Sequence, residues 1–202
     1  MRPGPILTLL RNLALPRSCL GCGRPHVWWC PACGDAVTAP EPLVTGHLGF
    51  PVASACPYDG PARELVLGFK EGLVTAVAPD LAALLGPALA MFPDAPLVPI
   101  PSTRRGRVRR GFEPVRLILH HQPRPVTGVL RWERVPTPQK TLGRSARLRN
   151  LSRAMVADRP VTGALLVDDV LTTGATLTEA ARAVAAAGGV VRGAVVVCRT
   201  QP

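Results

Sequence analysis

The stretch LLVDDVLTTGATLTEAARAVAAAGG, residues 165–189, decides the fold of this chain. Three apolar residues lead directly into Asp168 and Asp169, and a loop rich in threonine and glycine follows. The alanine-rich part places its apolar residues on one helical face, and the glycine pair at its end is typical of a C-cap. We therefore predict a strand over 164–168, a short loop, and a helix over 175–187.

Predicted strands and helices alternate through most of the chain. The predicted strands are 51–58, 97–100, 126–132 and an apolar, central 190–198; the predicted helices are 60–70, 79–92, the later part of 111–121, and a short one near 146–155. This alternation is typical of an α/β protein with an open, mainly parallel sheet and helices on both faces. We divide the chain into an N-terminal unit at 1–36, a linker at 37–50 and a main domain at 51–202.

The N-terminal unit contains four cysteines with the spacing CxxC-x7-CxxC, namely Cys19, Cys22, Cys30 and Cys33. Two thiolate pairs in tight turns are typical of a structural, tetrahedral zinc site in a small knuckle or ribbon. Two disulfides or a dithiol redox pair are the alternatives. The remaining cysteines, Cys56 and Cys198, fall in predicted strands and are interpreted as small core residues.

The first residues of the chain place Ile6, Leu9, Leu10 and Leu13 on one helical face. The apolar run is short, Arg11 interrupts it, and no small-residue cleavage site follows, so we interpret it as a docking helix and not as a signal peptide. Elsewhere the apolar runs are interrupted by Gly, Pro or Arg before they reach the length of a membrane span. We expect a cytoplasmic protein without membrane insertion.

Positive charge is concentrated in one part of the chain. The formal net charge is +11, and residues 104–159 hold 15 Arg or Lys against three acids, a local net charge of +12. Such an excess favours a polyanion or a phosphorylated ligand as partner. The alternative is a solvated face that is rich in arginine because of codon bias.

The loop after Asp169 has the chemistry of a phosphate site. In an open α/β sheet, ligands bind outside the carboxyl ends of the strands, and a helix N-terminus there favours an anion. The hydroxyls of Thr172, Thr173 and Thr176 add donors, whereas no Walker A or GxGxxG motif is present. A turn acid followed by a helix cap would explain one of the two aspartates but not both.

The sequence LLVDDVLTTGAT closely resembles the phosphoribosyl pyrophosphate (PRPP) motif of type I phosphoribosyltransferases. The resemblance implies that Asp168 and Asp169 hold the ribose 2′- and 3′-hydroxyls. It further implies a loop around the 5′-phosphate made by Thr172, Thr173, Gly174, Ala175 and Thr176. Mg²⁺ would accompany PRPP and bridge its diphosphate and ribose oxygens.

A cysteine knuckle before such a domain is similar to the ComF family of competence-associated proteins. Further matching stretches are Tyr58 to Arg63, Lys70 with Gly72, VPIP at 98–101, RGF at 110–112, PQ at 138–139, and Arg147 with Asn150. The resemblance covers nearly the whole chain. One departure is Glu113-Pro114, where the family usually has Asn-Gln after RGF.

The resemblance also implies a place for the pyrophosphate and a loop that closes over the site. Pyrophosphate would meet the loop after the strand at 97–100, and this group comprises Lys70, Ser102, Arg104, Arg105 and Arg110. The flexible loop would span 133–149, with polar contacts from Gln139, Arg147 and the nearby Asn150. For any single arginine here, a solvated surface charge is the alternative.

Three functions are compatible with this sequence. The first is a ComF-type factor that handles incoming single-stranded DNA during natural transformation, with competence-machinery proteins as further partners. Arginine-rich segments favour contacts to nucleic-acid phosphates, and Trp28, Trp29, Trp132 and Phe112 are among the few residues able to stack on bases. The second is an active phosphoribosyltransferase with an unknown acceptor, in which no residue is identified as general base. The third is a PRPP sensor without turnover.

Overall fold

A five-stranded sheet forms the centre of the protein, with the strand order β1-β2-β7-β6-β3. The computed structural model describes residues 17–37, 43–46, 48–134 and 153–200. The sheet strands are β1 (Leu43–Thr45), β2 (Val52–Pro57), β3 (Leu97–Pro99), β6 (Ala164–Leu171) and β7 (Val191–Arg199). Four of them run parallel, and only the edge strand β1 is antiparallel.

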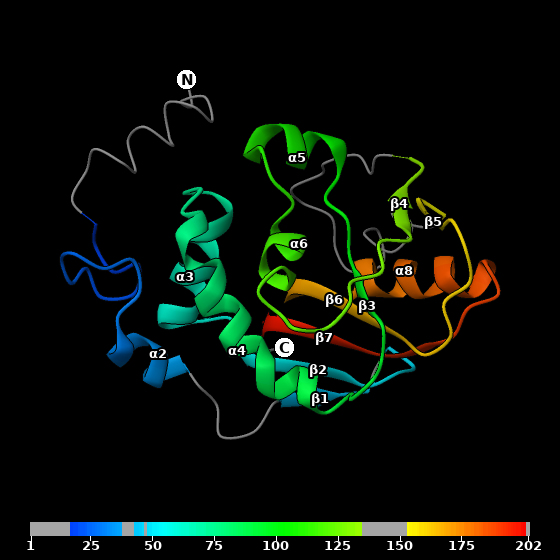
Figure 1. Cartoon of the computed structure of the whole chain (residues 1–202), viewed down its shortest axis with the longest axis horizontal. Helices are drawn as coiled ribbons and strands as arrows, with labels where there is room; N and C mark the ends of the chain where they lie inside the picture. Colours follow the sequence, from blue (N-terminus) through cyan, green and yellow to red (C-terminus); the bar gives the residue numbers. More distant parts are fainter. Residues whose placement is uncertain (1–16, 38–42, 47, 135–152, 201–202) are drawn as a thin grey trace.

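Helices cover both faces of this sheet (Figure 1). They are α2 (Pro31–Val37), α3 (Gly60–Lys70), α4 (Ala78–Ala90), α5 (Arg104–Arg110), α6 (Pro114–Leu119) and α8 (Ala175–Ala186), with a 3-10 turn at Thr75–Val77 before α4. The predicted fold class is therefore confirmed: an open, mainly parallel α/β sheet with helices on both faces and a cysteine cluster near the N-terminus.

The side chains of β6 divide the core into two halves. Leu165 and Val167 pack in the cluster formed with α3, α4 and α6, whereas Ala164 and Leu166 pack in the cluster formed with α8. Successive residues of a strand point to opposite faces, so a strand covered by helices on both sides is apolar at every position. β7 has the same character and lies at the centre of the sheet, as its sequence predicts.

The helices form where their apolar residues repeat with helical spacing. In α3, Leu65, Val66 and Phe69 are buried, and Pro61 lies in the first turn, where its missing N–H is not needed. The predicted bounds of this helix match the observed ones. In α4, Pro87 lies inside the helix, as predicted from its sequence.

A small second sheet packs beside α8. It pairs β4 (Leu130–Trp132) with β5 (Met155–Ala157) in antiparallel register. The buried carboxylate of Glu179 on α8 accepts a hydrogen bond from the Met155 N–H at 2.9 Å, and Arg182 donates to the Met155 carbonyl. Arg182 also pairs with Glu179, so both charged groups are satisfied where they hold β5 against the helix.

The structure corrects several predicted boundaries. Strand β1 lies inside the predicted linker. Strand β5 begins at Met155, where the helix predicted near 146–155 would have its last residue. Strand β6 continues to Leu171, three residues beyond the predicted end, and therefore contains both aspartates. The strand predicted over 126–132 is limited to β4 and belongs to the small sheet. The predicted N-terminal helix lies outside the described residues.

Helix α5 replaces a predicted loop. Its sequence RRGRVRR buries no residue, so it has no apolar face from which a helix could be predicted. Its ends are nevertheless well defined. The Thr103 hydroxyl accepts a hydrogen bond from the Gly106 N–H at the start, and Gly111 adopts φ 79° at the end. Capping therefore sets the bounds of this helix.

The cysteine-rich segment packs on the main domain through apolar side chains. Leu20, Trp28 and Trp29 are partly buried against the core cluster of α3 and α4. Over the residues described, no helix combines the length and the apolar character needed to cross a membrane.

Candidate functional site

A hollow of about 990 Å³ lies at the carboxyl ends of β3 and β6, between the end of α3 and helix α5. Its polar lining includes acids from β6, cations from α3 and α5, and hydroxyls from α8 and from the loops after β3 and β6. These residues are Lys70, Ser102, Arg105, Arg109, Arg110, Asp168, Asp169, Thr172 and Thr176. This is the edge of an open α/β sheet at which ligands bind. It is also where the sequence predicts the site.

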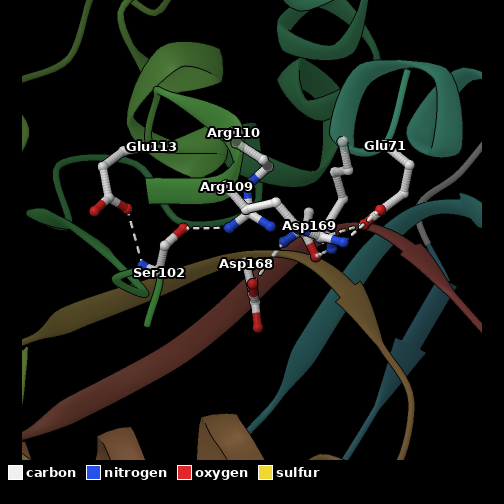
Figure 2. A network of polar contacts seen from close by, with 8 residues as sticks. Glu71, Ser102, Arg109, Arg110, Glu113, Asp168 and Asp169 are labelled. Atoms are coloured by element: carbon white, nitrogen blue, oxygen red, sulfur yellow. Dashed lines mark hydrogen bonds and ion pairs between the residues drawn. The ribbon is translucent and has the colours of Figure 1, made fainter. Parts of the chain in front are cut away.

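Asp168 and Asp169 point to opposite faces of β6, as successive residues of a strand must. Figure 2 shows the Asp168 carboxylate directed away from the arginines, while Asp169 lies toward the end of α3. The two are linked, because the Asp169 N–H donates to Asp168 Oδ1 at 2.9 Å. Burial, reinforced by the charge of Asp169, raises the pKa of Asp168 from 3.8 to about 7.

Lys70, the last residue of α3, neutralises one of the two acids. Its Nζ lies 2.8 Å from the Asp169 carboxylate, and both side chains are largely buried. Burial alone would lower the pKa of Lys70, but the Asp169 carboxylate outweighs it and raises the pKa above 10.5. Of the two aspartates in the hollow, Asp169 is therefore paired with a cation and Asp168 titrates near neutral pH.

Helix α5 contributes arginines to the hollow. Arg110 Nη2 donates to the Ser102 hydroxyl at 2.8 Å, and its buried Nε has no hydrogen-bond partner among the residues described. Burial, with the charge of Arg109 beside it, lowers the pKa of Arg110 from its usual value. Arg109 makes a bidentate pair with Glu71 at 2.6 and 2.7 Å (Figure 2). The Arg110 guanidinium lines the hollow and keeps one buried N–H without a partner among the residues described.

The threonine loop turns sharply at Gly174, whose φ is 76°. A Cβ at this position would also lie 2.6 Å from a methyl carbon of Leu48, so a side chain is excluded on both counts. The Gly174 carbonyl accepts hydrogen bonds from the Thr178 N–H and hydroxyl, which begins α8. Thr172 and Thr176 line the hollow on either side of this turn.

Most of the predicted site residues gather around this one hollow. Arg104 is exposed on α5, and neither it nor Thr173, Gly174 and Ala175 belongs to the lining. Gln139, Arg147 and Asn150 lie outside the described residues, so their predicted contacts stay predictions. Phe112 packs its ring on Phe69, with the centroids 5.3 Å apart. Trp132 lines the hollow and donates its indole N–H to the Pro101 carbonyl.

The sequence did not predict the roles of Glu71 and Arg109. Glu71 follows the predicted Lys70, and Arg109 lies in the same arginine run as the predicted residues. Their pairing joins positions 38 residues apart, and no local pattern signals it. Arg131, on β4, likewise pairs with Asp158 across the small sheet.

The four cysteines of the N-terminal segment form a second candidate site. The ligand atoms of Cys19, Cys22, Cys30 and Cys33 all lie within 4.8 Å of one another, and three of these residues are buried. The closest Sγ pairs are 3.6 and 3.7 Å apart, near the ~3.8 Å expected between ligands of a tetrahedral zinc–thiolate site. The cluster could hold a metal ion such as zinc.

Backbone N–H groups favour the thiolate of Cys19, whereas burial raises the pKa of the Cys33 thiol. Burial opposes ionisation of Cys19, but N–H groups of Cys22, Cys30 and Gly21 lower its pKa to about 6. A Cβ at Gly21 would lie 2.7 Å from Cys33 Sγ, so only glycine leaves room for the cluster. These features belong to a closed site without an open position for chemistry.

Cys56 and Cys198 lie far from this cluster, in neighbouring strands. They are paired in register between β2 and β7, fully buried, with their sulfur atoms 3.4 Å apart. Both are free thiols inside the sheet. This agrees with their interpretation as core residues.

Comparison with known proteins found no matching family model and no matching curated protein. The geometry of the hollow and of the cysteine cluster therefore has to support the functional proposal.

The raised pKa of Asp168 predicts that Asp168→Asn stabilises the protein at neutral and alkaline pH. A carboxyl whose pKa is raised by folding contributes stability below about pH 4, and this contribution is lost as the pH rises through about 7. At pH 8 we expect the variant to gain on the order of 2 kcal/mol in the free energy of unfolding. Urea denaturation at pH 4, 6 and 8 measures this, with Asp158→Asn on the surface as control. An equal effect of Asp168→Asn at all three values would contradict it.

The cysteine cluster predicts one bound metal ion per chain after purification in zinc-containing medium. Cys30→Ser should abolish this stoichiometry, because removing one of four thiolates opens the site. Elemental analysis by mass spectrometry measures the metal, and thermal unfolding with and without a chelator measures the stability that it provides. Cys56→Ala is the matched control, since it removes a thiol outside the cluster. Metal retained in Cys30→Ser but lost in Cys56→Ala would refute the assignment.

Proposed function

We propose that this chain is a ComF-type competence protein that binds PRPP or a related phosphorylated ribose and acts with incoming single-stranded DNA in the cytosol. The observation that carries the proposal is the lining of the hollow, which combines two aspartates with hydroxyls, a lysine and several arginines. A ribose phosphate has complementary chemistry, since its hydroxyls are hydrogen-bond donors and its phosphates are anions.

The ligand would bind with its hydroxyls toward the aspartates. Thr172, Thr176 and the N-terminus of α8 would surround the 5′-phosphate, because their donors converge at the end of β6. Arg110 would contact a second phosphate through its guanidinium group, which lines the hollow. Lys70 neutralises Asp169, and its ammonium group faces the same hollow, within reach of the diphosphate. Mg²⁺ would accompany the diphosphate and retain several water ligands.

Helix α5 supports the DNA part of the proposal. Five of its seven residues are arginines, it contains no acid, and Arg104, Arg105, Arg107 and Arg109 are all exposed. It lies beside the hollow and at the outer edge of the molecule (Figure 1). Exposed guanidinium groups on one short helix suit contacts to a flexible phosphate backbone, and Trp132 offers a half-buried ring nearby.

We assign the metal at the cysteine cluster as zinc, with a structural role. The donor set is four thiolates, the buried thiols leave no open position, and the segment packs on the main core through Leu20 and Trp29. The metal would therefore fix a short segment that has few apolar residues of its own. The knuckle surface would remain available to DNA or to competence-machinery proteins.

Turnover of PRPP is the second candidate function. Asp168 has a pKa of about 7 and lines the hollow, so it could take a proton near neutral pH. In such a reaction the bond from ribose C1 to the pyrophosphate oxygen breaks and a bond from C1 to an acceptor forms. The acceptor would lose its proton to Asp168, and pyrophosphate would leave with the bonding electrons. Binding without pyrophosphate release would instead indicate a sensor.

Calorimetric titration with PRPP and Mg²⁺ tests the ligand. Wild type should bind, and the double variant Asp168→Asn/Asp169→Asn should bind at least tenfold more weakly, because neutral amide oxygens replace the charged acceptors of the ribose hydroxyls. The control is Glu64→Gln/Asp158→Asn, which removes the same charge from exposed positions outside the hollow. Equal affinity of the double variant and the wild type would refute the site. A pyrophosphate assay on the same samples distinguishes turnover from binding.

Single-stranded DNA binding should weaken steeply as the salt concentration rises. Arg104→Ala/Arg105→Ala should reduce the slope of log affinity against log salt by about 1 to 1.5, since each lost phosphate contact removes about 0.7. Fluorescence anisotropy with a labelled oligonucleotide at several salt concentrations measures it. Arg192→Ala, an exposed arginine at the start of β7, serves as control. Salt-independent binding, or a larger change from the control, would count against a DNA-binding role for α5.

A further inference from the structure

Glu113 lies next to the hollow, where its carboxylate contacts Ser102 of the lining without belonging to the lining itself. It occupies the N-cap position of α6, but its side chain makes no capping hydrogen bond. Instead Oε2 accepts a hydrogen bond from the Ser102 N–H at 2.9 Å, and Oε1 lies 3.5 Å from Arg107 (Figure 2 shows the first contact). Its side chain is only 21% exposed, so water screens its charge poorly.

Glu113 thereby occupies a donor that an anion in the hollow would use. Ser102 lines the hollow, and its hydroxyl already accepts from Arg110. Other cations of the lining are also paired with acids: Arg109 with Glu71, and Lys70 with Asp169. Acids of the same chain therefore partly neutralise the cations of the hollow. Arg110 Nε has no hydrogen-bond partner among the described residues.

The effect of this carboxylate depends on the charge of the ligand. Ser102 follows β3, whereas Thr172 follows β6, so a monophosphate held by the threonine loop would bind at a different strand end from Ser102. A diphosphate held by Arg110 lies beside Ser102, which is in contact with both Arg110 and Glu113. It also carries more negative charge, so the repulsion from Glu113 is greater.

We propose that Glu113 is a specificity-determining residue that lowers the affinity of the hollow for diphosphate ligands relative to monophosphates. This rests on the proposed function, in that a phosphorylated ribose binds in the hollow. It concerns the ligand class of that site, because PRPP itself carries a diphosphate: Glu113 lowers the affinity for PRPP without excluding it. Ribose 5-phosphate groups, including those at nucleotide and DNA 5′ ends, escape the repulsion.

Substitution of Glu113 by glutamine tests this directly. Gln retains a carbonyl oxygen that can accept the Ser102 N–H, so the loop keeps its hydrogen bond while the negative charge is removed. Calorimetric titration with PRPP–Mg²⁺ and pyrophosphate–Mg²⁺ should give an affinity about tenfold higher in Glu113→Gln than in wild type. The affinity for ribose 5-phosphate should change by less than about twofold to threefold.

Two further variants keep the test decisive. Glu64→Gln removes an exposed carboxylate of α3 outside the hollow, and it should change no affinity. Glu113→Asn removes the same charge and places a favourable N-cap residue before α6, so it should shift selectivity in the same direction even if the glutamine variant folds poorly. Circular dichroism melting curves identify any variant with impaired folding.

Three results separate the possible outcomes. Tighter binding of the diphosphate ligands alone supports the proposal. Unchanged PRPP affinity in both Glu113 variants, or an equal gain for PRPP and ribose 5-phosphate, overturns the role of Glu113 while the proposed function stands. Absence of binding of all three ligands to wild type and both Glu113 variants overturns the proposed function itself, and the inference with it.

Discussion

The alternation of side chains along β6 is the constraint on which the candidate site depends. The strand is apolar on both faces up to Val167 and then places two acids at successive positions. Alternation sends Asp169 toward α3 and Asp168 toward α8, so Lys70 at the end of α3 contacts Asp169 directly and acts on Asp168 only through its charge. Lys70 pairs with Asp169, and no cation among the described residues forms an ion pair with Asp168, so burial raises the pKa of Asp168 to about 7. The different electrostatic states of Asp168 and Asp169 therefore follow from the alternation of side chains along one strand.

Much of the fold could be predicted because its elements carry strong local patterns. β6, α8, β7 and α3 all combine apolar repeats with recognisable ends, and the spacing of four cysteines was enough to predict their cluster. Helix α5 could not be predicted from periodicity, since none of its residues is buried. Its capping residues, Thr103 and Gly111, were the available signal.

The sequence predicted which residues line the hollow better than it predicted which of their charged groups form ion pairs. Topology brings the ends of parallel strands to one edge, so the residues after β3 and in β6 had to meet. Which charge pairs with which depends on side-chain geometry across long separations, as between Lys70 and Asp169, 99 positions apart. The contact from Glu113 to the Ser102 amide is of the same kind. Local sequence patterns do not predict such contacts.

The absence of buried residues in α5 has a consequence for how this protein can change over evolutionary time. A helix fixed by its caps and by surface ion pairs places almost no packing demand on its own side chains. Substitutions there alter the charge beside the hollow while the sheet and its two apolar clusters stay intact. Ligand preference can therefore drift in this segment independently of stability, and lineages with the same core could diverge in what they bind.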